Sequence, residues 1–306
     1  MTTCTRRHFL KSATAAAVAG PFGSRFTQAA GTTLHVACNQ FCWITMYRRQ
    51  GLDFNADLDA GLAEVKRSGM DGLEAMLDDV AEAERFVELL KKHGLEMRSF
   101  YTGATLHDPA ERDASIERVV ATAAMAKELI DLRIVVVNPT PLRQQEKSDA
   151  QLTTQAKALT ELGGHLAELG LTLAYHFHAP AWRNEGHEFY HVMTETDPNF
   201  VKLCLDTHWV YRGSGNNVTR VYEVVERYGK RVAELHIRQS TNNVWSEYLT
   251  EGDIDYVKVA DGLMAQGVKP LLVLEQAVEK GTSNTMGAVE SHRRSRVYVE
   301  KVFAWR

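Results

Sequence analysis

Side chains of the types that bind metal ions recur along this chain at regular intervals. Asp206 follows His178 by 28 residues and precedes His236 by 30. Glu275 comes another 39 residues along the chain. Imidazole and carboxylate donors in one pocket can hold a divalent cation, and mixed nitrogen and oxygen ligation suits Mn or Zn better than Ca. We therefore expect one divalent metal ion, with Mn, Zn, Co and Mg all open, that polarises a substrate carbonyl.

The elements that position these residues are short apolar runs alternating with longer amphipathic segments. Eight runs predict β-strands, at residues 34–38, 72–76, 97–101, 133–138, 172–177, 201–206, 231–237 and 270–276. Eight other segments predict helices, at residues 58–68, 80–93, 110–130, 150–169, 188–196, 218–228, 255–266 and 289–303. Units of roughly 34 residues are the size expected of a (β/α)₈ barrel. We predict an α/β fold, a single TIM-barrel domain over residues 31–306.

Polar side chains at the ends of the predicted strands should meet at one place. The C-terminal ends of parallel barrel strands all open on the same mouth. The strand ends carry Glu74, Tyr101, Asn138, His176 with His178, Asp206, His236 and Glu275. The first strand leads into Asn39-Gln40-Phe41-Cys42-Trp43, without the glycine-rich phosphate loop that is usual in a doubly wound open sheet. The barrel is therefore the favoured fold, and its mouth is the predicted site.

The first thirty residues form a separate segment. Arg6 and Arg7 are followed by Phe9, Leu10 and Lys11, and then by an alanine-rich stretch. This pattern is typical of a twin-arginine export signal. We therefore expect residues 1–30 to be a signal peptide and the protein to be exported, to the periplasm, by the twin-arginine pathway.

Composition and charge describe a soluble globular domain with small-molecule chemistry. The chain is 44% hydrophobic and 24% charged. Four of its 35 basic residues and none of its acidic residues lie in residues 1–30, so the rest carries 31 basic against 39 acidic side chains. A net charge near −8 argues against nucleic-acid or anionic-membrane partners, because phosphate binding needs a positive face. We expect a small carbohydrate ligand, with a homo-oligomer left open.

Several motifs together give the chain a family resemblance. They are Asp71-Gly72-Leu73-Glu74, Tyr175-His176-Phe177-His178, Leu205-Asp206-Thr207-His208-Trp209, Glu234-Leu235-His236-Ile237-Arg238 and Leu274-Glu275. With them the chain resembles the xylose isomerase-like TIM barrels, among them sugar phosphate isomerases and epimerases, over essentially everything after residue 30. The resemblance implies that Asp206, His236 and Glu275 are three of the metal ligands.

The fourth ligand is open, because the chain departs from the family pattern there. Many relatives carry a carboxylate at the end of strand five or a Glu three residues after a His-x-His pair, where this chain has Ala181. We take His178 as the first candidate and His176 as the next, with Glu185 and Glu188 as alternatives from the following loop. His176 and His178 could instead bond only substrate hydroxyls.

Proton transfer and substrate binding are expected from the residues around the ion. Relatives often read His-x-Lys-Asp where this chain has Arg238-Gln239, and an arginine holds an oxygen and does not act as a base. The predicted proton carriers are Glu275, His178 and His208, with Glu74 as a further possibility. Tryptophans after strand ends can stack on a sugar ring. The predicted substrate-binding residues are Asn39, Glu74, His176, Trp182, Trp209 and Arg238.

Three functions are compatible with this site. The first is a metal-dependent sugar or keto-sugar isomerase or epimerase that works through an enediolate. The alternative is a lyase or dehydratase that removes a β-substituent from a keto-sugar or glycoside. The third is a sugar-binding barrel without catalysis, which the alanine at residue 181 suggests. All three place a carbohydrate against a divalent ion or its former site.

Overall fold

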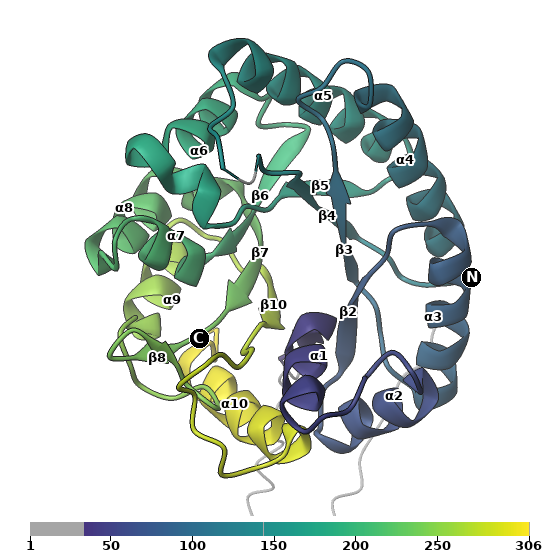
Figure 1. The fold of residues 1–306 in the computed structure, drawn as a ribbon, viewed down its shortest axis with the longest axis vertical. Helices are drawn as coiled ribbons and strands as arrows, with labels where there is room; N and C mark the ends of the chain where they lie inside the picture. The colour runs from purple at the N-terminus through teal and green to yellow at the C-terminus, as the bar shows by residue number, and fades with distance from the viewer. Residues whose placement is uncertain (1–33, 143, 306) are drawn as a thin grey trace, which may run out of the picture. The chain divides into compact units, whose positions relative to one another are not determined.

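Eight parallel strands form a closed barrel in the computed structural model, which describes residues 34–142 and 144–305. Helices lie outside the ring of strands (Figure 1). The strands are β1 (Val36–Asn39), β2 (Gly72–Met76), β3 (Ser99–Ala104), β4 (Ile134–Pro139), β5 (Thr172–Tyr175), β6 (Val201–Asp206), β7 (Val232–Ile237) and β10 (Leu271–Leu274). They follow one another around the barrel in chain order, and β10 closes it by pairing with β1. The predicted (β/α)₈ barrel is confirmed.

Ten α-helices connect or follow the strands in the described part of the chain. They are α1 (Gln40–Arg49), α2 (Leu58–Arg67), α3 (Val80–His93), α4 (Arg112–Leu129), α5 (Asp149–Glu168), α6 (Arg183–Glu195), α7 (Thr207–Gly213), α8 (Val218–Tyr228), α9 (Tyr256–Ala265) and α10 (Ala288–Val302). The helix α8 shows why such segments are helical, because Val221, Val224, Val225 and Tyr228 form one buried stripe. A capping box of Ser148 and Gln151 begins α5.

The strand register brings the predicted ligands to one level of the barrel. Asp206 on β6 lies opposite His236 on β7, and His236 lies opposite Val273 on β10. Side chains alternate between the faces of a strand, so Glu275, two residues after Val273, points to the same side as Val273. Residues that are 30 to 39 positions apart in the chain therefore become neighbours.

Two helices and a hairpin were not among the predicted elements. Asn39 Oδ1 accepts a hydrogen bond from the Phe41 amide and caps α1. Asp206 Oδ1 accepts bonds from the amides of His208 and Trp209 and caps α7. Each helix thus starts directly at a strand end, with no separate loop to mark it. After β7 the chain makes a hairpin of β8 (Ser240–Thr241) and β9 (Val244–Trp245).

The predicted export signal at residues 1–30 lies outside the described residues. Within residues 34–142 and 144–305, none of the helices combines the length and hydrophobicity that a bilayer crossing requires.

Candidate metal centre

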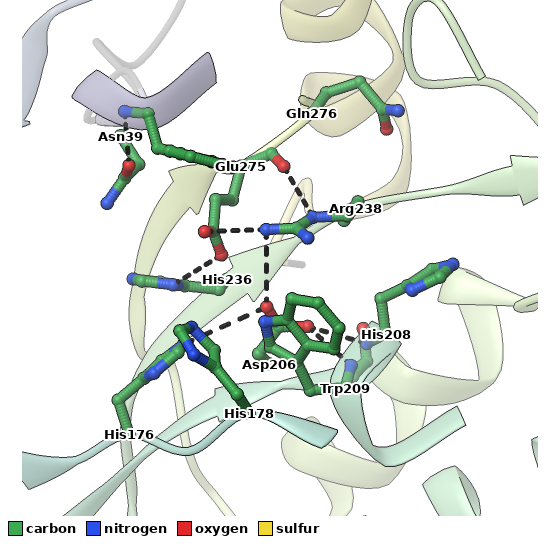
Figure 2. Close-up of polar contacts among 12 residues, drawn as sticks. Asn39, His176, His178, Asp206, His208, Trp209, His236, Arg238, Glu275 and Gln276 are labelled. Carbon is green, nitrogen blue, oxygen red and sulfur yellow. Dashed lines mark hydrogen bonds and ion pairs between the residues drawn. The ribbon is translucent and has the colours of Figure 1, made fainter. Parts of the chain in front are cut away.

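Four buried side chains converge at the C-terminal ends of neighbouring strands (Figure 2). They are His176, directly after β5; Asp206, the last residue of β6; His236 on β7; and Glu275, directly after β10. One ligand atom from each lies within 4.8 Å of the others. Each residue is at most 5% exposed. The arrangement offers two imidazoles and two carboxylates to a single point.

Unpartnered polar atoms in this group indicate a cation site. Neither ring nitrogen of His176 has a hydrogen-bond partner among the described residues, and Asp206 Oδ2 has none either. His176 Nε2 lies 3.9 Å from Asp206 Oδ2. Burying polar atoms without partners is costly. Burial raises the pKa of Asp206 to about 7, although Arg238 opposes the shift. A divalent ion would satisfy these atoms, so the residues fit the metal that the sequence predicts.

A second layer of carboxylates holds His236 in place. His236 Nδ1 is 2.9 Å from Glu275 Oε2 in the metal group. On the other side of the ring, His236 Nε2 is 2.8 Å from Glu74 Oε2 and 3.1 Å from Glu234 Oε1. A carboxylate behind a histidine orients the ring toward a metal. Burial, opposed by His236, raises the pKa of Glu74 to about 8.

This layer changes the expected role of two residues. Glu74 and Asn39 were predicted to bind substrate, but Asn39 Nδ2 donates to Glu74 Oε1 at 3.1 Å. Both side chains are buried, Glu74 behind His236 and Asn39 at the start of α1. Their contacts in the structure are with the protein itself. Glu234 was missed by the sequence reasoning. Its signal was its position two residues before His236, on the same face of β7.

Arg238 is fully buried beside the metal group. Its Nη2 lies 2.6 Å from Glu275 Oε1 and 3.8 Å from Asp206 Oδ2, and its Nε donates to the Glu275 carbonyl oxygen at 2.8 Å. The guanidinium carbon is 4.3 Å from the ring centre of Trp245 and 5.1 Å from that of Trp209. Burial would raise the pKa of Glu275, but Arg238 and His236 hold it well below its usual value. Arg238 and Trp209 thus lie beside the metal group, and their role in substrate binding stays a prediction.

His178 lies next to the metal group but outside it. Its Nδ1 is 3.4 Å from Asn138 Nδ2, and its ring centre is 5.0 Å from that of Trp209. Burial lowers the pKa of His178 to about 4, so the ring is neutral at physiological pH. The side chain stays partly exposed, as expected of a group that meets substrate.

Among the candidates for the fourth ligand, the geometry favours His176. Glu185 points to solvent: its side chain is 90% exposed, and its carboxylate lies 3.8 Å from Arg220. Glu188 accepts from Lys147 Nζ at 2.6 Å and from Gln155 Nε2 at 3.0 Å. The ligand set as a whole stays a prediction.

Two predicted residues are engaged elsewhere. His208 Nδ1 accepts from Trp245 Nε1 at 3.3 Å and its Nε2 is 3.0 Å from Ser240 Oγ, so neither nitrogen is free for the proton transfer that we expected. Burial lowers the pKa of His208 to about 2. Trp182, predicted to stack on a sugar, is buried against Phe189 with ring centres 4.8 Å apart. Both side chains support the loops around the mouth.

Three known proteins are similar to this chain in sequence or in fold. Inosose dehydratase from Geobacillus kaustophilus is 25% identical over 167 residues, which cover 51% of this chain and 53% of the relative. The solved structure of an L-ribulose 3-epimerase has a TM-score of 0.66 at 17% identity and covers 89% of this chain and 95% of its own. The IOLI protein, solved with a zinc atom, has a TM-score of 0.65 at 17% identity and covers 89% and 98%.

The family assignment follows from a wider match. The match to the dehydratase spans about half the length of that relative, and the two solved structures establish only a shared fold. The family model described as Xylose isomerase-like TIM barrel matches residues 62–296, well over half of the chain. This range includes all four residues of the metal group. The chain belongs to the xylose isomerase-like TIM barrel family.

Proposed function

We propose that this protein is a metal-dependent isomerase or epimerase of keto-sugars. The observation that carries the proposal is the set of unpartnered atoms of His176 and Asp206, in a buried group with His236 and Glu275. These four residues would hold the ion. When bound, a divalent ion polarises the substrate carbonyl, acidifies the adjacent C–H bond and stabilises the resulting enediolate.

Two proton carriers flank the group. Glu275 follows β10 and His178 lies beyond β5, and these strands are the two ends of the arc β10-β7-β6-β5. Glu275 is ionised and His178 is neutral, so each can accept a proton from carbon. If the carrier that removes the proton returns it to the neighbouring carbon, the carbonyl moves. If the other carrier first takes up a proton from solvent and delivers it to the opposite face, the configuration changes. The placement of the carriers supports isomerisation or epimerisation.

A dehydratase is the second candidate. The inosose dehydratase from G. kaustophilus supports it, as does Arg238-Gln239 in place of the lysine and aspartate that relatives often carry. Abstraction of the same proton would then be followed by loss of a β-hydroxyl as water. The two candidates share the metal and the base and differ in the fate of the carbanion.

Incubation in D₂O separates the candidates. The Mn-loaded protein, without its first thirty residues, is mixed with L-ribulose, D-fructose or an inosose and followed by NMR and ultraviolet absorbance. Deuterium at the carbon beside the carbonyl, together with an epimer or isomer, supports the first candidate. A new conjugated absorbance with loss of water supports the dehydratase. Sugar binding without deuterium uptake or product would contradict both and favour a binding protein.

We further propose export by the twin-arginine route. Arg6 and Arg7, followed by Phe9, Leu10 and Lys11, support this proposal. Fractionation of cells that express the full chain tests it: the processed protein should be periplasmic, and Arg6→Lys/Arg7→Lys should retain it in the cytoplasm. A periplasmic double variant would contradict the proposal.

A further inference from the structure

A charged residue in the site suggests the class of substrate. We propose that the substrate is anionic, a keto-sugar acid whose carboxylate is next to the carbonyl carbon, and that Arg238 binds this carboxylate. The inference rests on the proposed function, because it places the sugar against the metal group. It makes Arg238 a residue that determines specificity, and it gives the substrate a negative charge.

The guanidinium of Arg238 is held rigidly. Trp245 and Trp209 pack against it, with its carbon 4.3 and 5.1 Å from their ring centres. Trp245 is itself anchored, because its Nε1 donates to His208 and its amide donates to Glu279 Oε1 at 2.9 Å. With aromatic rings against it, the guanidinium can bind new partners mainly through its edge. A planar fork of this kind matches a carboxylate.

Both terminal nitrogens of this fork are buried and have no hydrogen-bond partner among the described residues. Nη1 can therefore donate to a ligand oxygen. The neighbouring Nη2 lies 2.6 Å from Glu275 Oε1 and 3.8 Å from Asp206 Oδ2, which are atoms of the metal group. An oxygen that meets Nη1 is therefore close to the group that would polarise the carbonyl. The carboxylate and the carbonyl of one small molecule can be held together in this way.

The charges of the site point to an anion more than to a hydroxyl. Asp206 and Glu275 bring two negative charges, whereas a divalent ion and Arg238 bring three positive charges, so these two carboxylates leave one positive charge unbalanced although Arg238 is paired with Glu275. Glu279 lies nearby but is paired through both oxygens with Arg212, at 2.8 and 2.9 Å. Glu74 and Glu234 lie beyond His236 and bond its Nε2. An unbalanced positive charge in a buried group is costly, and a sugar hydroxyl would supply a hydrogen bond but no charge.

A matched pair of ligands tests the proposal. D-Fructose and 2-keto-D-gluconate share the carbonyl at C2 and differ at C1, which is a hydroxymethyl group in the first and a carboxylate in the second. Isothermal titration of the Mn-loaded protein should show at least tenfold tighter binding of the acid, as a charge-assisted hydrogen bond would give. Metal content is measured on every sample.

Variants assign the preference to one residue. Arg238→Gln should abolish the preference for the acid, and Arg238→Lys should keep part of it. Arg212→Gln is the matched control, because Arg212 also stacks on Trp245, at 4.8 Å, but is paired with Glu279. That control should retain the preference. The main comparison, between the affinities for the two ligands, is made on the native protein. It can therefore be made even if a variant folds poorly.

The outcomes separate this inference from the proposed function. Equal affinities for the two ligands, no binding of the acid, or a preference that survives in Arg238→Gln would overturn the inference while leaving metal-dependent chemistry intact. A preference for the acid with no deuterium uptake at the adjacent carbon would support the inference and contradict the proposed function.

Discussion

Two buried ionic groups in this barrel differ in how their charges are met. In the metal group, His176 and Asp206 have polar atoms without partners. In the second group, Lys147 Nζ lies 2.6 Å from Glu188 Oε1, and Gln155 also donates to that oxygen. Lys147 is as buried as the metal ligands, with 1% of its side chain exposed. The metal group lacks a positive charge that a bound ion would bring, whereas in the second group Lys147 supplies the positive charge that Glu188 needs.

The difference separates two uses of buried charge. An ion pair whose members meet each other holds segments together, here the chain before α5 and the helix α6. A group with unmet polar atoms is instead organised for something that binds. Substitutions in the pair of Lys147 and Glu188 should change stability without changing metal binding, and substitutions in the metal group should remove the metal. The predictions below test this separation.

The largest expected effect is the loss of the metal. Asp206→Ala removes a ligand, so bound metal should fall from about one equivalent to none and turnover should disappear with it. Elemental analysis measures the first and the deuterium-exchange assay the second. Glu188→Gln, from the second group, is the control and should keep its metal. Full metal content in Asp206→Ala would contradict the assignment of the metal to the group that contains Asp206.

A large effect on stability is expected at the second group. Lys147→Met leaves the Glu188 carboxylate without its partner, which should reduce the free energy of unfolding by about 3 kcal/mol. Urea denaturation followed by circular dichroism measures the change. The double variant Lys147→Met/Glu188→Gln should recover most of it, with metal content unchanged throughout. A loss of metal in the single variant would show that the two groups are not independent.

Metal addition should stabilise the folded protein by a somewhat smaller amount. An ion at one hundred times its dissociation constant contributes about 2.7 kcal/mol by mass action. The melting temperature of the metal-free protein should therefore rise by several degrees on adding Mn or Zn. The same addition should leave the melting temperature of Asp206→Ala unchanged. An equal rise in that variant would show that the metal binds elsewhere.

The smallest effect is expected at Glu185. Its side chain is 90% exposed and its carboxylate lies 3.8 Å from Arg220, so Glu185→Ala should change the unfolding free energy by less than about 0.5 kcal/mol. Metal content should stay the same. A drop in bound metal would restore Glu185 as a ligand from the loop.

Much of the fold could be predicted because each element has its own periodic pattern. The strands β2 and β6 and the helices α3 and α8 begin and end at the predicted residues. The helices α1 and α7 could not be predicted in this way. Their N-caps, Asn39 and Asp206, are the same residues that end the preceding strands, so the sequence shows no boundary between strand and helix.

The site was harder to predict than the barrel. Spacing and the family resemblance pointed to Asp206, His236 and Glu275, because one residue per strand–helix unit returns to the same mouth, and the structure brings these three together. The sequence analysis preferred His178 to His176, but the two are two positions apart on the same side of an extended chain, and the structure places His176 in the group. It also missed Glu234, whose contact with His236 depends on how the barrel interior is filled.

Metal content of three proteins, measured side by side, tests the central claim most directly. The native protein, His176→Ala and His178→Ala are purified in the same way, reconstituted with Mn or Zn, dialysed and analysed for bound metal. The account predicts about one equivalent in the native protein and in His178→Ala, and almost none in His176→Ala. Metal retained in His176→Ala but lost in His178→Ala, or no metal in the native protein, would contradict it.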